Sequence, residues 1–247
     1  MGIPMLNILK HSINTYFSNI YLILLSSLSF IIAFLIPLFA SFPTYNDIGG
    51  VLLRTASIYL NLNPFNTAII VIAVLFSLLF LSFAMVAINI VVKHSRTQTR
   101  IRSEVIRGIE KYTGNVFMIL FIATVLMVLA NILTFNSGYS AIITVIAALA
   151  ITPFVFYAPA SIVVDDANPI RSIRASLKFF AKRFDYFLVW LVIAIVLLTF
   201  FDFLFITVSG TALSRYVMLI FSSLFILPFL VLLQGELYIS RFKLLKG

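Results

Sequence analysis

The sequence contains no cysteine and only two histidines, His11 and His94. The absence of cysteine excludes disulfides, iron–sulfur clusters, thiolate zinc sites and cysteine nucleophiles. So few histidines argue against a histidine-rich metal site. The chain also lacks a phosphate-binding glycine loop, a His-Glu-x-x-His pair, a Gly-x-Ser-x-Gly elbow and an EF-hand loop. We therefore expect no catalytic residue, no metal site and no cofactor.

Charged residues are also scarce, because they make up 10% of the 247 residues whereas 62% are hydrophobic. Soluble domains carry about 25% charged residues, so this chain has too few to cover a water-exposed surface. Its apolar residues occur in runs of about 20, the length that crosses a bilayer as a helix. They do not alternate with polar residues as in a membrane β-barrel. The sequence predicts an all-α, multi-pass membrane protein with a single membrane domain over residues 1–247.

Six apolar runs are long enough to cross a membrane, and we expect six transmembrane helices arranged as three hairpins. They cover approximately residues 20–39, 65–92, 116–135, 140–162, 186–208 and 216–233. Of the 17 Lys and Arg residues, only Arg54 and Arg215 fall on the side opposite to the two termini. The positive-inside rule therefore places both termini in the cytoplasm and the protein in the cell membrane. The partly apolar external loop 40–64 suggests a short helix that lies on the outer surface or covers the mouth of the bundle.

Each hairpin is preceded by apolar residues that recur at intervals of four, three and four, which is one stripe of an amphipathic helix. The three sets superpose without a gap at offsets of 96 and 164, and Ser12 coincides with Ser176: Leu9, Ile13, Tyr16 and Ile20; Val105, Ile109, Tyr112 and Val116; Ile173, Leu177, Phe180 and Phe184. The pattern predicts three repeat-like units, 1–92, 93–164 and 165–247, each with a cytoplasmic amphipathic helix before its hairpin. Such duplication occurs in transporters, but interfacial helices also give this pattern without duplication.

The polar faces of the second and third amphipathic segments are basic. They supply the candidate lipid or partner surface: Arg96, Arg100, Arg107, Lys111, Arg171, Arg174, Lys178 and Lys182. An apolar stripe beside a basic stripe is typical of a helix in the headgroup layer, where each Lys or Arg contributes about 1 kcal/mol toward an anionic leaflet. We expect this surface to bind anionic lipid headgroups or a cytoplasmic protein partner, and not nucleic acid. The alternative is that these residues only fix the topology.

Ionisable residues are nearly absent from the six runs, and only Asp202 falls well inside one. Together with Asn131 and Asn89 it forms the candidate intramembrane polar site, since ionisable groups at bilayer depth are costly and usually functional. Asp202 binds a proton or cation in one interpretation, and in the other it is a hydrated rim carboxylate or pairs with Arg215 or Arg54.

The remaining acids are expected near the cytoplasmic surface. Glu236 is predicted just to emerge into the headgroups. Asp165 and Asp166 precede a helix that begins at Asn168-Pro169, where Asn caps the helix and Pro suits its first turn. We expect the two carboxylates to interact favourably with the positive end of the dipole of this helix. The pair would bind a hard cation only with further oxygen ligands. Small residues in the fourth run predict that this span packs closely at the centre of the bundle: Ala147, Ala148 and Ala150.

Residues 158–180 read Ala-Pro-Ala-Ser-Ile-Val-Val-Asp-Asp-Ala-Asn-Pro-Ile-Arg-Ser-Ile-Arg-Ala-Ser-Leu-Lys-Phe-Phe. This stretch resembles a region of six-span proteins of the glycerophosphodiester phosphodiesterase membrane-domain type. In that family a span, an acidic residue and a small-residue turn precede an amphipathic helix with a central serine. Asp165 or Asp166 and Ser176 occupy the matching places. No soluble phosphodiesterase domain is present, so the resemblance implies a membrane domain without assigned chemistry.

Two classes of function remain. The leading prediction is a non-enzymatic membrane protein that organises lipids or a cytoplasmic partner through its basic amphipathic helices. The alternative is a transporter or permease subunit for an apolar or lipid-like substrate, driven by a separate ATPase. A membrane-embedded enzyme comes third, because it needs a water-accessible polar cluster that joins Asp202 to Asn131 or Asn89.

Overall fold

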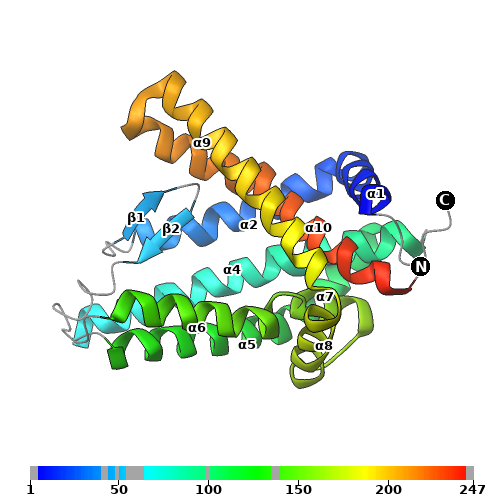
Figure 1. Ribbon diagram of the computed structural model, residues 1–247, viewed down its shortest axis with the longest axis horizontal. Helices are drawn as coiled ribbons and strands as arrows, with labels where there is room; N and C mark the ends of the chain where they lie inside the picture. Colours follow the sequence, from blue (N-terminus) through cyan, green and yellow to red (C-terminus); the bar gives the residue numbers. More distant parts are fainter. Residues whose placement is uncertain are drawn as a thin grey trace.

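The computed structural model describes residues 5–39, 44–47, 50–53, 64–97, 101–134 and 139–242. Its helices are α1 (Met5–Ser18), α2 (Ile20–Phe39), α4 (Pro64–Thr97), α5 (Ile101–Thr134), α6 (Ser140–Val155), α7 (Ala158–Asp165), α8 (Pro169–Lys182), α9 (Phe184–Phe221) and α10 (Leu227–Ile239). A π-helical turn, η1 (Ser222–Ile226), joins α9 to α10, and a 3-10 turn, η2 (Ser240–Phe242), follows α10. The architecture is a helical bundle with one small pair of strands at one end (Figure 1).

Six helical stretches are long and apolar enough to cross a membrane, which confirms the predicted number of spans. They cover Ile20–Pro37, Thr67–Ser95, Val105–Thr134, Ile142–Asp165, Phe184–Val208 and Leu213–Phe242. The last two stretches form a hairpin, and helix α9 continues from one into the other without an irregular loop. The rings of Phe201 and Phe221 lie 4.6 Å apart, although a straight helix would separate these residues by about 30 Å. The chain therefore reverses direction within α9 (Figure 1).

The predicted plan of three separate amphipathic helices is only partly correct. Helix α1 ends at Ser18, one residue before α2, and α8 is separate from both α7 and α9. The middle segment instead continues without a break into α5, which is 34 residues long. Nothing between Arg107 and Val116 stops the helix, because the segment has no proline and its two glycines, Gly108 and Gly114, each cost only about 1 kcal/mol.

The external loop 40–64 contains strands where a helix was suggested. Strand β1 (Thr44–Asp47) pairs antiparallel with β2 (Gly50–Leu53), with Thr44 opposite Leu53. The predicted surface helix falls mostly on residues 54–63, which lie outside the described residues. Within its described part, the loop forms a small antiparallel pair instead.

One end of the bundle carries α1, α8, η2 and the ends of α4 and α5 that face each other, and we call it the basic end (Figure 1). There α4, α7 and α10 contact one another. Each belongs to the second span of its hairpin, and its residues at this end are almost all buried: Val86–Val92 on α4, Tyr157–Val163 on α7 and Leu230–Ile239 on α10.

Span six is the most central span. In its most apolar 18-residue window 56% of the residues are buried, against 6% for Phe184–Val208 and 17% for the fourth span. The prediction that span four is central therefore holds only for its last part, α7. Ala150 on α6 is exposed, and α6 lies at the periphery because α7, beyond the break at Phe156 and Tyr157, makes the central contacts.

Candidate functional site

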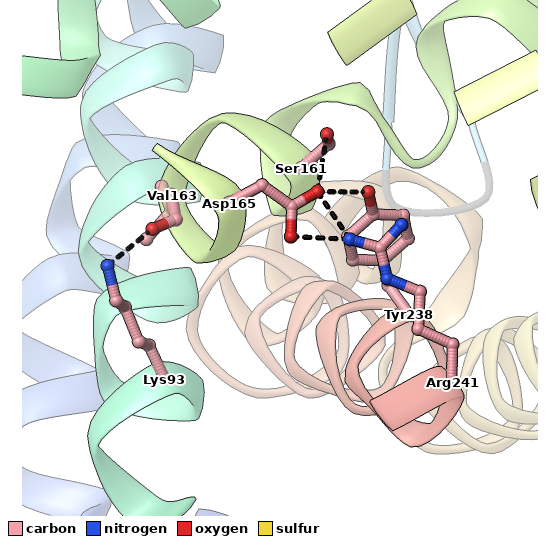
Figure 2. Close-up of polar contacts among 6 residues, drawn as sticks. All are labelled: Lys93, Ser161, Val163, Asp165, Tyr238 and Arg241. Carbon is pink, nitrogen blue, oxygen red and sulfur yellow. Dashed lines mark hydrogen bonds and ion pairs between the residues drawn. The ribbon is translucent and has the colours of Figure 1, made fainter. Parts of the chain in front are cut away.

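Ionisable and hydrogen-bonding side chains gather at the basic end around Asp165, the last residue of α7 (Figure 2). Its carboxylate accepts hydrogen bonds from the hydroxyls of Tyr238, at 2.6 Å, and of Ser161, at 3.1 Å. The guanidinium of Arg241 on η2 forms an ion pair with the same carboxylate. We call Ser161, Asp165, Tyr238 and Arg241 the Asp165 cluster. It joins α7 to α10 and η2.

The Asp165 cluster is well satisfied for a half-buried charge. Its carboxylate keeps 18% of its side-chain surface exposed, and three donors occupy its two oxygens. The guanidinium of Arg241 also lies 4.1 Å from the centre of the Tyr238 ring. A partly buried ion pair stabilises only when hydrogen bonds offset its desolvation, and this arrangement meets that condition.

The opposite side of α7 is held by Lys93 of α4. Its ammonium donates a hydrogen bond to the carbonyl of Val163, with an N–O distance of 2.8 Å (Figure 2). A lysine head group carries three donors, and this contact fixes its position against the last turn of α7. The end of α7 is thus held by side chains from both neighbouring second spans.

Asp166 does not share the role of Asp165, although the two are adjacent. Asp166 adopts a left-handed backbone conformation, with φ 52°, which Asp tolerates better than most residues. Its carboxylate pairs with the ammonium of Lys111 on α5, at 2.6 Å. The hydrogen bond from Lys111 lowers the pKa of Asp166 below its ordinary value. The two acids thus contact different neighbours, since Asp165 holds η2 and Asp166 holds α5. Their effect on the dipole of α8 stays a prediction.

Glu236 is fully buried, which corrects the prediction that it emerges into the headgroups. Its Oε1 lies 3.4 Å from the hydroxyl of Ser95 and 3.6 Å from Nε2 of His11. A buried carboxylate needs such partners, because an isolated one would be strongly destabilised. The sequence could not reveal this environment, since α1 and α4 close over the end of α10 only in the folded bundle.

The predicted intramembrane site is spread over different helices. Asn89 is fully buried on α4, and a Cβ added at Gly235 of α10 would lie 2.7 Å from its Oδ1. Asn131 lies near the far end of α5, where its amide donates to the carbonyl of Met127. Asn89 lies toward the end of α4 and Asn131 toward the end of α5, which runs back along α4. With a rise of about 1.5 Å per residue, the two asparagines are therefore about 30 Å apart along the helix axes. Asp202 is half-buried on α9, and its pairing with Arg215 stays a prediction. Arg54 lies outside the described residues.

Helix α8 presents the clearest basic surface. Ser172, Ser176 and Phe179 face inward, and the exposed residues include every basic residue predicted there: Arg171, Arg174, Lys178 and Lys182. The predicted apolar stripe is partly exposed, since Leu177 is 39% exposed. At the start of α5, Arg107 and Lys111 are also exposed. Arg100 and the side chain of Arg96 lie outside the described residues.

Ser176 fixes α8 to the bundle. Its hydroxyl donates to the carbonyl of Pro153, at 2.8 Å, and accepts the backbone N–H of Tyr157, at 3.0 Å. These groups lie where α6 ends, so the serine supplies partners that the broken helix lacks. Asn168 caps the first turn of α8 by accepting the N–H of Arg171, at 2.9 Å, as the Asn-Pro sequence predicts.

Two hollows flank the end of α7. The α4–α5 pocket has a volume of about 170 Å³ and is lined on both walls by basic residues, among them Lys93, Arg107 and Lys111. The α7–α8 pocket has a volume of about 490 Å³, and its lining includes Asp165, Arg171 and Arg241. Among the described residues, no group of three or more His, Cys, Asp or Glu side chains is placed to hold a metal ion.

Sequence reasoning missed the residues that assemble the basic end: Lys93, Ser161, Asp165, Glu236, Tyr238 and Arg241. One signal was available, because each of the three second spans carries an ionisable residue in or next to its last turn. Their partners lie far apart in sequence, 76 residues for Arg241 and Asp165 and 141 residues for Glu236 and Ser95, so spacing alone does not pair them.

The resemblance of residues 158–180 to the phosphodiesterase membrane domains stays a prediction. Comparison of this chain with family models, curated proteins and solved structures found no match.

Proposed function

We propose that this chain is a non-catalytic, multi-pass membrane protein whose basic end faces the cytoplasm and binds anionic lipid headgroups. The observation that carries the proposal is the exposed face of α8. It places a row of basic side chains beside apolar ones, of which Ile170 is 67% exposed. A helix of this kind lies in the headgroup layer, with its apolar side chains toward the acyl chains and its basic side chains on phosphate groups.

The strength of binding follows from the number of charges. Each Lys or Arg near an anionic leaflet contributes about 1 kcal/mol, so the four basic residues of α8 together contribute several kcal/mol at low salt. Salt weakens this attraction, because the Debye length is about 8 Å at physiological ionic strength. Ser176 and the Asn168 cap hold α8 in place, so the binding surface is ordered before lipid arrives.

Apolar side chains at the same end support a position at the membrane surface. Leu6, Ile13 and Phe17 are exposed on α1, and Ile106 is exposed at the start of α5. Such residues are unfavourable in water but suit the boundary between headgroups and acyl chains. The orientation with this end in the cytoplasm rests on the positive-inside rule.

The packing of α10 favours this proposal over a transporter. A substrate path between the spans needs an opening at the centre, whereas the residues of α10 at the basic end are buried against α1, α4 and α7. A cytoplasmic protein partner would compete with lipid for the same face of α8. Such a partner is an alternative outcome of the test below.

The test compares two exposed arginines at opposite ends of the bundle. The full chain is reconstituted in nanodiscs of phosphatidylcholine with increasing phosphatidylglycerol, and the anionic lipids enriched around it are counted. We expect Arg174→Glu to reduce this enrichment by about tenfold, the effect of roughly 1 to 2 kcal/mol. The matched variant Arg215→Glu should change it by less than about twofold, because Arg215 lies at the far end. Equal effects of the two variants would contradict the proposal.

A further inference from the structure

We infer that the α4–α5 pocket at the basic end binds the phosphate group of an anionic lipid. The inference rests on the proposed function, because it needs the basic end to lie at the membrane surface. The pocket is a different site from the face of α8, however, and it would bind the phosphate group of a single lipid molecule.

The first support is the composition of the pocket walls. Helix α4 contributes Lys93 and His94, and α5 contributes Arg107 and Lys111, so both walls carry groups that bear or accept a positive charge. None of the described residues that line the pocket is acidic. A site of this composition favours a ligand with at least one full negative charge.

The second support is that the lysines are held in place. The ammonium of Lys93 is anchored on the carbonyl of Val163, and that of Lys111 on Asp166. Both ammonium groups also lie against the ring of Tyr112, at 5.7 and 5.1 Å from its centre. Cations near an aromatic ring are further stabilised by its electrons. A ligand that enters therefore meets charges already in position, which lowers the entropic cost of binding.

The size of the pocket suits a phosphate group. A volume of about 170 Å³ is far above the roughly 10–15 Å³ that a single water molecule needs. That space admits a tetrahedral phosphate with its ester oxygens. Arg107 would donate paired hydrogen bonds to two of the phosphate oxygens, because the geometry of a guanidinium matches that of a phosphate. The lysines would contribute as point charges.

The level of the pocket points to a lipid as the source of the phosphate. Lys93 lies two residues before the end of the candidate span Thr67–Ser95, and Arg107 lies in the first turn of Val105–Thr134. Ile106, next to Arg107, is 72% exposed and would contact acyl chains. Basic pockets between transmembrane helices on the cytoplasmic side are known sites for phospholipid headgroups.

The test uses Arg107→Gln with Lys10→Gln on α1 as the matched control, since both remove one exposed positive charge at the basic end. The full chain is placed in phosphatidylcholine nanodiscs, and single-site binding of phosphatidic acid is measured by native mass spectrometry. We expect Arg107→Gln to weaken this binding by about tenfold or more, as the loss of a charge-assisted hydrogen bond predicts. Lys10→Gln should change it by less than about threefold, and Arg107→Lys should restore part of the affinity.

Three results separate the possibilities. If Arg107→Gln and Lys10→Gln weaken phosphatidic acid binding equally, the pocket is not a site, although the proposed function of α8 stands. If Arg174→Glu also leaves the enrichment of every anionic lipid unchanged, the proposed function fails as well. Inorganic phosphate at millimolar concentration serves as the free-phosphate probe. If it displaces phosphatidic acid completely, the source of the phosphate is not a lipid and the inference is overturned. Thermal melting of each variant verifies that it folds.

Discussion

Helices α1 and α8 occupy similar positions at the basic end, and they differ mainly in what they expose. At the predicted offset of 164, three of the four buried residues of α1 coincide with the buried residues of α8: Ile8, Ser12 and Thr15 match Ser172, Ser176 and Phe179. The exposed faces differ, since α1 carries Lys10 among its exposed apolar residues whereas α8 carries four basic side chains. Two helices of the same register can therefore pack without the charges, so the charges of α8 are not needed to place it.

The two helices are also attached differently. Ser12 donates its hydroxyl hydrogen bond within α1, to the carbonyl of Ile8, whereas Ser176 bonds across to the break between α6 and α7. Helix α1 relies instead on Tyr16, whose hydroxyl donates to the carbonyl of Phe225 in η1. Burial raises the pKa of Tyr16 to about 12, so this donor keeps its proton at every physiological pH.

The largest difference between the two helices should appear when their matching serines are replaced. Ser176→Ala leaves the buried N–H of Tyr157 without its partner, and we expect a loss of about 1–3 kcal/mol in the free energy of unfolding. Ser12→Ala removes only a bond within one helix, so its cost should stay below about 0.5 kcal/mol. Equilibrium unfolding in mixed micelles measures both, and equal costs would refute the difference in attachment.

A smaller effect is expected at the attachment of α1. Tyr16→Phe keeps the ring, which packs edge-on against Phe229 with centres 5.7 Å apart, and removes only the hydrogen bond to Phe225. We expect a loss of about 0.5–1.5 kcal/mol. Hydrogen exchange should then increase in α1 and not in α8. An increase shared by both helices would show that they are not independently attached.

The smallest effect is expected from acid, at the ion pair of Lys111 and Asp166 that lies just before α8. Because Lys111 lowers the pKa of folded Asp166, this pair stabilises the fold above the unfolded pKa of about 3.9. That contribution is lost as the pH falls through the lowered folded pKa. We expect Asp166→Asn to be less stable than wild type at pH 6 and equal to it at pH 2, measured by unfolding. A difference that persists at pH 2 would assign another role to Asp166.

The spans and α8 were predictable because their signals are local. The apolar runs predicted the six spans, and Asn168-Pro169 predicted the start of α8. The spacing of Arg171, Arg174 and Lys178 predicted its exposed basic face. These features depend on helical periodicity and on capping, which neighbouring residues determine.

The polar contacts at the basic end were not predictable, because they depend on packing between distant segments. Glu236 becomes buried and meets Ser95 and His11 only when α4 and α1 close over it. Asp165 meets Tyr238 from another hairpin. The continuous helix α5 was missed for a related reason. Its first part is amphipathic like α1, which suggested a separate helix. No helix-breaking residue follows this part, so the helix continues directly into the span.

The central claim is that the charges of α8 bind anionic lipid. The most direct measurement is the number of phosphatidylglycerol molecules retained by the chain after purification, in three forms: wild type, α8 with Arg171, Arg174, Lys178 and Lys182 all changed to Gln, and α1 with Lys10→Gln. We predict that the α8 variant loses most of its phosphatidylglycerol and that the α1 variant retains nearly all of it. Equal retention by all three forms, with each variant folded, would contradict the claim.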